Sequence, residues 1–234
     1  MIRKLLVSIA LKLGLYKDAV NIGTKFIHKK LGRKMKKHGL EALIQADKAL
    51  KSADSFCFFA FGTLLGAYRD KNFISSDKDL DLGILAENYP SNLTDLLKDY
   101  GFKHLRQFHF KNSNEIIIDV YMYKGVQIDF FKYYNEGDDL YCYFGSAHEE
   151  LPYEQANATN GFPAGVCFSE NKGFSKINFL GYDFYAPENI EQWLISVYGK
   201  SFMIPKKNWL FYDHISEENL RVKFINDRLY RENF

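Results

Sequence analysis

Three carboxylates alternate with other side chains in the segment Asp77-Lys-Asp79-Leu-Asp81. In an extended strand, side chains two residues apart point to the same face, so the three carboxylates would share one face and leave Leu80 and Leu82 on the other. Like charges on one face repel each other and destabilise the strand unless a cation neutralises them. Carboxylate oxygens suit Mg²⁺ or Mn²⁺, which also bind phosphate oxygens. The spacing therefore indicates a metal site for a phosphorylated substrate.

The residues just upstream favour a metal site over a solvated acidic turn, which is the usual interpretation of a bare acidic run. Residues 56–61 form a short apolar run typical of a buried strand. Gly62 and Thr63 follow at once, where the strand would end in a turn with free backbone N–H groups. The apolar residues after them predict a short helix over 62–69, and helix N-termini bind anions. We therefore expect Gly62 and Thr63 to bind a phosphate of the substrate.

The segment 61–83, FGTLLGAYRDKNFISSDKDLDLG, resembles the signature of the LicD family. That family comprises bacterial phosphocholine transferases and, in animals, fukutin and the fukutin-related protein. The matching residues are Gly62, Thr63, Leu64, Leu65, Gly66, Ala67, Arg69, Phe73, Ile74, Asp77, Asp79, Asp81 and Gly83. The resemblance continues more weakly over residues 55–210.

The resemblance implies a nucleotidyltransferase-like fold and a defined reaction. A phospho-alcohol (phosphocholine, glycerol phosphate or ribitol phosphate) would move from a CDP-linked donor to a glycan hydroxyl, on a free glycan or a lipid-linked saccharide. This chain departs from the family pattern at Ser75-Ser76, where Pro-Trp is frequent, at Lys78, where an acid is frequent, and at Asp70, where a basic residue is common. These departures keep the acidic residues and leave the identity of the donor open.

A fourth carboxylate, Asp129, lies in the apolar stretch Val126-Gln-Ile-Asp-Phe-Phe131. A lone acid in an apolar strand is costly unless it is paired or metal-bound. We therefore expect its strand to lie beside that of Asp79 and Asp81 and to complete a carboxylate triad, and the resemblance implies the same role. Asp119 is the alternative third member, although the outer edge of a hairpin suits it better.

These residues are expected to perform phosphoryl transfer, which depends on alignment and charge neutralisation. Asp79 and Asp81 would hold Mg²⁺ (or Mn²⁺) against the pyrophosphate of the donor, with Asp77 as a further ligand. Asp129 would hold a second metal ion or accept the proton of the acceptor hydroxyl. Arg69 would bind phosphate with its guanidinium or form a salt bridge to the acidic cluster, and both roles stay open.

Two other classes of function share parts of this pattern. A nucleotidyltransferase that adds a nucleotide to protein, RNA or a small molecule would have the same Gly-Thr turn and Asp-x-Asp pair. A catalytically silent binding module is disfavoured by the intact carboxylates. Residues 64–69 and the long interval from Thr63 to Asp79 favour the LicD type, for which no nucleic acid partner is expected.

Composition and charge predict an α+β protein with two parts. The 234 residues are 47% hydrophobic and 17% aromatic, which suffices for a core without a metal or disulfide staple. We expect a nucleotidyltransferase-like mixed β-sheet flanked by helices over residues 39–234. Residues 1–38 form a basic amphipathic helical arm, since residues 1–40 hold eleven Lys or Arg and one acid. Such helices bind anionic membrane surfaces, and the alternative is a solvated helix packed on its own domain.

Hydrophobic periodicity places the remaining elements. Helices are expected over residues 2–13, 39–52 and 216–230 and after Pro187, and a loop that could act as a lid over 146–165. Strands are expected over residues 56–61, 78–85, 102–110, 115–123, 126–134, 140–144 and 176–185.

The cysteines and the hydropathy indicate the compartment. Cys57, Cys142 and Cys167 lie in apolar or aromatic runs and are typical of reduced core residues, which points to the cytosol. No run approaches the roughly 18 apolar residues of a membrane span, and no signal-peptide cleavage site follows the N-terminal apolar run. We expect a cytoplasmic protein with peripheral contact at the inner face of the membrane.

Overall fold

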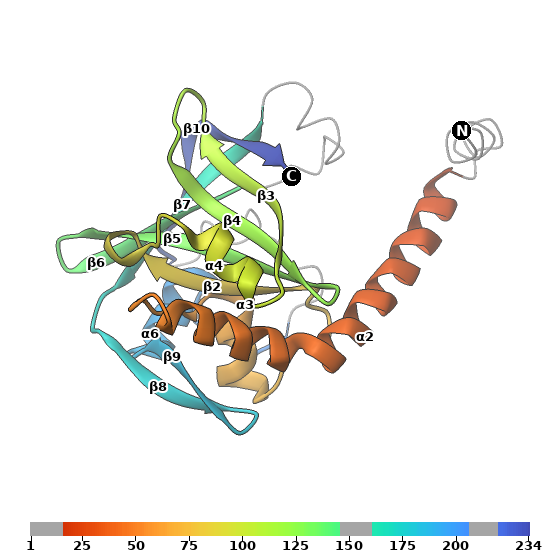
Figure 1. The fold of residues 1–234 in the computed structure, drawn as a ribbon, viewed down its shortest axis with the longest axis horizontal. Helices are drawn as coiled ribbons and strands as arrows, with labels where there is room; N and C mark the ends of the chain where they lie inside the picture. Colours follow the sequence, from red (N-terminus) through yellow and green to blue (C-terminus); the bar gives the residue numbers. More distant parts are fainter. Residues whose placement is uncertain (1–15, 146–160, 206–219) are drawn as a thin grey trace.

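The computed structural model describes residues 16–145, 161–205 and 220–234, which form a ten-stranded mixed sheet with a few helices (Figure 1). The expected α+β class is confirmed. The helical elements are α2 (Tyr16–Lys51), α3 (Phe61–Leu65), the π-helical turn η1 (Gly66–Asp70), the 3₁₀ turn η2 (Ala86–Asn88), α4 (Leu93–Asp99) and α6 (Ile190–Tyr198). The strands are β1 (Phe58–Phe59), β2 (Asp79–Leu85), β3 (Lys103–Phe110), β4 (Ile116–Tyr123), β5 (Val126–Glu136), β6 (Asp139–Gly145), β7 (Phe162–Glu170), β8 (Phe174–Phe179), β9 (Tyr182–Pro187) and β10 (Val222–Asn233).

The strands follow the order β4-β3-β10-β7-β6-β5-β2-β1-β9-β8. Most neighbours are antiparallel, but β2 pairs with β5, and β1 with β9, in parallel. Strand β5 also pairs with β4 along residues 126–131 and with β6 along residues 133–136. The pairing therefore runs from β5 through β4, β3, β10, β7 and β6 back to β5, a closed circuit that the sequence pattern did not indicate.

The central strands β2 and β5 present one polar and one apolar face. Leu80 and Leu82 are each 1% exposed, whereas Asp79 and Asp81 on the alternate positions are only partly buried. Helices α3 and α6 pack on the aspartate face, where Trp193 of α6 contacts the ring of Phe58. Helix α2 lies on the opposite face, where Glu41 accepts a hydrogen bond from Tyr123. The acidic residues thus line the face covered by α3 and α6.

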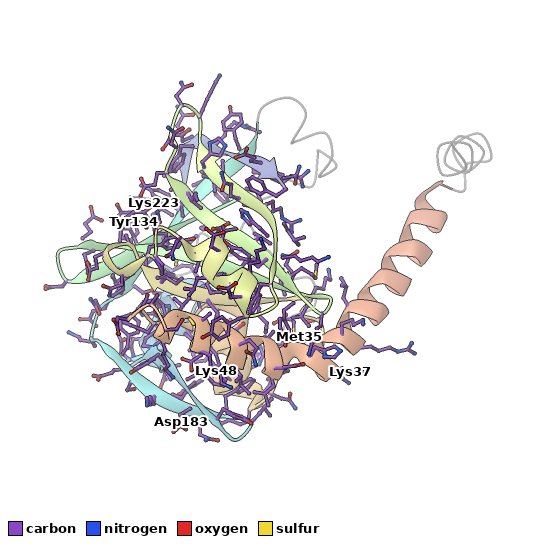
Figure 2. The ribbon with its side chains drawn as sticks, viewed as in Figure 1. Met35, Lys37, Lys48, Tyr134, Asp183 and Lys223 are labelled. Atoms are coloured by element: carbon purple, nitrogen blue, oxygen red, sulfur yellow. The ribbon has the colours of Figure 1, made fainter. Side chains whose placement is uncertain are left out.

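Helix α2 is continuous across the boundary expected after residue 38. Within residues 31–51, whose side chains are described, the buried side begins at Met35, which is 3% exposed, and repeats at helical spacing to Leu50. Figure 2 shows Met35 and Lys37 where the helix meets the body, while the N-terminal part of α2 extends away from the sheet in Figure 1. The helix expected over residues 2–13 lies outside the described residues, so the division into arm and domain stays a prediction.

The prediction of a helix over residues 216–230 is wrong for residues 220–230, the part that the structure describes. Residues 222–233 form β10, which pairs antiparallel with both β3 and β7. The register shifts between Phe224 and Arg228, so that Val222 and Leu229, seven residues apart, are both buried. Such an irregularity breaks the two-residue alternation of a strand and leaves a spacing that imitates a helix.

The segment around residues 176–185 also differs from expectation. The single expected strand is a hairpin of β8 and β9, in which Phe179 pairs with Tyr182 across the two-residue turn Leu180-Gly181. Both turn residues have positive φ, 51° and 88°, as a tight hairpin requires. Most of the expected loop over residues 146–165 lies outside the described residues, and its end belongs to β7.

On the same face as Asp79 and Asp81, Gly83 of β2 allows an aromatic ring to lie directly on the backbone. A Cβ atom at Gly83 would stand 2.3 Å from the ring of Phe58, which is fully buried. That ring also packs against Tyr133 and Trp193, with centroids 5.0 and 6.0 Å away. Since the ring is enclosed on several sides, it cannot move aside for a side chain at position 83.

We predict that Gly83→Ala destabilises the protein by about 1–3 kcal/mol, because an added methyl group overpacks this aromatic core. The matched control is Gly32→Ala in α2, where the nearest atom to an added Cβ is 4.0 Å away. That change should be neutral or stabilise the helix by up to about 1 kcal/mol. Urea unfolding of both variants checks the prediction, and equal unfolding free energies for the two would contradict it.

Candidate active site

Two neighbouring parallel strands bring the predicted acidic residues together. β2 and β5 pair with Asp79 opposite Gln127 and Asp81 opposite Asp129. Residues opposite each other on adjacent strands share a face, and the strands lie about 5 Å apart. The expected placement of Asp129 beside Asp79 and Asp81 is therefore confirmed.

The alternative residue Asp119 lies on the other face of the sheet. It stands opposite Phe130, whose side chain alternates with that of Asp129. Its carboxylate is 2.5 Å from His104 Nε2 and accepts hydrogen bonds from the hydroxyls of Tyr121 (2.8 Å) and Tyr89 (3.2 Å). Asp119 is thus a satisfied core residue and cannot complete the carboxylate cluster.

Gly62 lies against two of the carboxylates. A Cβ atom at this position would stand 2.8 Å from Asp77 Oδ2 and 3.1 Å from Asp81 Oδ2. The Gly62 N–H donates a 2.9 Å hydrogen bond to Asp81 Oδ2. A glycine is needed here because a side chain would occupy the space of the carboxylates. The N–H expected to be free for phosphate therefore already has a partner on Asp81.

Helix α3 is fastened to the backbone of Asp81. Thr63 Oγ1 accepts a 2.8 Å hydrogen bond from the Asp81 N–H, and the Ala60 N–H donates a 3.1 Å bond to the Asp81 carbonyl. Between these contacts Phe61 adopts a φ of 36°. A bulky residue in the left-handed region costs about 1–3 kcal/mol and persists only where its surroundings hold it. The turn that presents Gly62 is therefore strained and held in place by β2.

The clustered carboxylates resist ionisation together. Burial, followed by the charge of Asp79, raises the pKa of Asp77 to about 6 and that of Asp129 to about 8. Burial also raises the pKa of Asp79, and burial with the charges of Asp79, Asp129 and Asp77 raises the pKa of Asp81 well above its usual value. A nearby cation would reverse these shifts, since it favours the charged form.

The donor set fits a hard divalent cation by its chemistry. Asp77 and Asp81 lie against Gly62, Asp129 is paired with Asp81, and Asp79 shares their strand face. Carboxylate oxygens of this kind suit Mg²⁺ or Mn²⁺. In the described part of the chain, however, no three Asp, Glu, His or Cys side chains converge as a preformed metal site. Hydrogen bonds from Gly62 and Gln127 hold Asp81 and Asp129. Metal ligation by Asp77, Asp79, Asp81 and Asp129 stays a prediction.

Arg69 lies beside this cluster but pairs with its neighbour. Its Nε and Nη2 donate to the two oxygens of Asp70 at 2.7 and 3.0 Å, and its Nη1 donates to the Phe202 carbonyl at 3.3 Å. The expected salt bridge to the acidic cluster is replaced by this pair with Asp70. Phosphate binding by Arg69 stays a prediction and would require exchange of this partner.

Sequence reasoning missed a second arginine, Arg106 of β3. Its Nη2 donates a 2.6 Å hydrogen bond to Gln127 Oε1, and Gln127 Nε2 donates a 2.8 Å bond to Asp129 Oδ1. The charge of Arg106 opposes the rise in the pKa of both Asp79 and Asp129. The strand over 103–110 carries no motif, so only the pairing of β3 with β4 reveals this residue.

Comparison with known proteins places this fold and site in a family context. The model of the family described as LicD/FKTN/FKRP, nucleotidyltransferase domain, matches residues 55–189. The chain is 26% identical over 175 residues to the protein called ribitol-5-phosphate transferase FKTN from Macaca fascicularis, and equally to those from Homo sapiens and Mus musculus. The match covers 74% of this chain and 35% of each relative, so the chain spans about a third of the length of those relatives.

We predict that Asp129→Asn stabilises the metal-free protein increasingly as the pH rises from 4 to 8. The folded-state pKa of Asp129 is raised to about 8, so the folded protein holds a proton that the unfolded chain releases near pH 4. The unfolding free energy of the wild type therefore falls as the pH rises from 4 to 8. The variant lacks this contribution, because asparagine does not titrate. The gain at pH 8 should be on the order of 1 kcal/mol or more.

Thermal unfolding in EDTA at several pH values measures this difference. The exposed carboxylate of Asp183, at the β8–β9 hairpin in Figure 2, provides the control, because Asp183→Asn should show no such trend. A stability difference for Asp129→Asn that is constant from pH 4 to 8 would contradict the prediction.

Proposed function

This chain belongs to the LicD/FKTN/FKRP family, and from that premise we propose that it transfers a phospho-alcohol from a CDP-linked donor to a glycan hydroxyl. The observation that carries the proposal is the in-register pairing of Asp81 with Asp129, with Asp79 on the same face. The name of the relatives makes ribitol phosphate the first candidate for the transferred group. Phosphocholine and glycerol phosphate are the alternatives within the same reaction class.

The reaction we propose is a single displacement at phosphorus. The acceptor hydroxyl attacks the phosphorus that bears the alcohol, a new P–O bond forms, and the pyrophosphate bond breaks to release CMP. Asp129 lies on the face where it can accept the proton of the hydroxyl, and Arg106 beside it favours the ionised form that a base requires. Asp77, Asp79 and Asp81 would hold Mg²⁺ (or Mn²⁺), which supplies charge neutralisation to the phosphates when bound.

A nucleotidyltransferase is the second candidate, because the matching family model is described as a nucleotidyltransferase domain. The same carboxylates would then serve transfer of a nucleotide to protein, RNA or a small molecule, and the leaving group would be pyrophosphate. The two functions differ in their released product, which an assay can identify directly.

We predict that Asp79→Asn and Asp81→Asn each lower turnover of a CDP-linked donor by at least about 100-fold, because charge neutralisation dominates phosphoryl transfer. Both variants should fold, since losing a like charge relieves repulsion, and Asp183→Asn should keep full activity. CMP release from CDP-ribitol, CDP-glycerol and CDP-choline with Mg²⁺ is the measurement, and EDTA should abolish it.

The same panel separates the candidates when CTP and ATP are included. A bound donor raises the melting temperature by mass action, so the nucleotide that stabilises the protein indicates the donor class. Pyrophosphate release from CTP or ATP without turnover of any CDP-alcohol would favour the nucleotidyltransferase. Full activity of either aspartate variant would reject the proposed site.

We also propose that the basic N-terminal segment contacts anionic membrane, where a lipid-linked acceptor would lie. Residues 1–40 hold eleven Lys or Arg and one acid, and each basic residue near an anionic surface contributes about 1 kcal/mol. No helix in the described ranges is long and apolar enough to cross a bilayer. The contact that we propose is peripheral. Cytoplasmic location is part of the same proposal.

We predict that the full chain co-sediments with phosphatidylserine-containing vesicles and that added salt weakens this binding, because salt screens the charges. A chain that begins at residue 31 keeps the buried Met35 and should fold, turn over soluble donor normally and lose vesicle binding. Vesicles of phosphatidylcholine alone are the control. Equal sedimentation with both vesicle types, or none with either, would contradict the prediction.

A further inference from the structure

A row of directly opposed residues crosses four strands on the aspartate face. Arg106 of β3 stands opposite Val120 of β4, Val120 opposite Asp129 of β5, and Asp129 opposite Asp81 of β2. Since adjacent strands lie about 5 Å apart, the Cα atoms of Arg106 and Asp129 are separated by about 10 Å. An arginine side chain spans most of that distance, so its guanidinium reaches the edge of the carboxylate cluster.

The guanidinium of Arg106 is incompletely satisfied in this position. Its Nη2 donates to the neutral Gln127 Oε1, and its Nε is buried with no hydrogen-bond partner among the described residues. Among the described residues no carboxylate forms an ion pair with it, in contrast to Arg69, which has Asp70. A partly buried cation with an unused donor is costly unless an anion occupies the adjacent space.

Gln127 fixes the direction in which Arg106 faces. Its oxygen accepts from Arg106 and its amide nitrogen donates to Asp129 Oδ1 at 2.8 Å, so the orientation of the side-chain amide is defined by partners at both ends. The bridge also keeps the guanidinium and the carboxylate from meeting in a direct ion pair. Among the described residues, Gln127 is the only acceptor of a side-chain hydrogen bond from Arg106.

We propose that Arg106 is an anion-binding residue of this site and that the anion it binds is a phosphate group of the substrate. The proposal rests on the proposed function, in which a pyrophosphate must lie against the carboxylate cluster. A planar guanidinium binds phosphate oxygens through two parallel hydrogen bonds, which a lysine cannot reproduce. Arg106 would thus hold the phosphate from the β3 side while the carboxylates hold its counter-ion.

The competing role for Arg106 is structural. Its positive charge lies near Asp79 and Asp129 and could serve only to offset their repulsion. Arg106→Lys separates the two roles, because lysine keeps the charge but lacks the planar fork. A structural counter-charge survives this change, whereas two-point phosphate binding does not.

The experiment measures the affinity of the full chain for inorganic pyrophosphate by calorimetry in Mg²⁺. Arg106→Gln should weaken binding about 10- to 100-fold, and Arg106→Lys should weaken it by at least about threefold without loss of thermal stability. Gln127→Glu keeps Arg106 but gives it an internal anionic partner, and it should also weaken binding. The control is Lys103→Gln, which removes an exposed charge from the same strand and should leave the affinity unchanged.

The proposal is overturned if the wild-type chain does not bind pyrophosphate, or if Arg106→Lys binds it as tightly as the wild type, which is the result that a structural counter-charge predicts. The assay also separates this inference from the proposed function. Arg106-dependent pyrophosphate binding without turnover of any CDP-linked donor would preserve the anion site and reject the transferase. Turnover of a donor with equal kcat/KM in wild type and Arg106→Gln would preserve the transferase and reject the anion site.

Discussion

The parallel pairing of β2 with β5 is the constraint on which the site depends, because it holds Asp81 directly beside Asp129. Two carboxylates at this separation repel each other, and the backbone hydrogen bonds of the sheet hold their strands together. Individual hydrogen bonds and one nearby positive charge offset part of this repulsion. Gly62 donates to Asp81, Gln127 donates to Asp129, and Arg106 stands behind Gln127. Each contact offsets part of the cost and leaves the cluster short of positive charge.

Rigid packing beside the cluster, on the same face of the sheet, sustains that strained arrangement. The ring of Phe58 lies on Gly83, two residues from Asp81, and is enclosed by Tyr133 and Trp193. Helix α3 is tied to Asp81 at Ala60 and Thr63 even though Phe61 must adopt a positive φ. Close-packed aromatic rings are hard to compress, so they prevent β2 from bending, and the carboxylates cannot move apart.

The two faces of the sheet show how the surroundings decide what a buried aspartate does. Asp119 is 1% exposed and has His104, Tyr121 and Tyr89 as partners, so its carboxylate is fully occupied within the protein. Asp129 has one amide donor and two carboxylate neighbours. A fully hydrogen-bonded acid stabilises the fold, whereas an acid with one hydrogen-bond donor and like-charged neighbours is poised to bind a cation or accept a proton.

The sequence alone determined the local chemistry of the site. The alternation of Asp79 and Asp81 with Leu80 and Leu82 predicted a strand with one acidic face, and the Gly-Thr turn predicted the short helix before it. Both are local patterns of backbone periodicity, and the structure contains both. The apolar surroundings of Asp129 also predicted its partner strand, because an isolated acid in a buried strand needs a neighbour.

Only the tertiary structure decided which residues complete the site and which strands residues 222–233 pair with. Arg106 enters through the pairing of β3 with β4, a contact that no local pattern in its strand encodes. Residues 222–233 become β10 because two strand edges accept them, and the irregular register hides the alternation that would reveal a strand. Gly62 and Gly83 matched a motif, but the fold explains why glycine is required at each position. Two carboxylates lie against Gly62, and an aromatic ring lies against Gly83. Local periodicity determines which way a side chain points, whereas the identity of the group that it meets depends on strand pairing between distant segments.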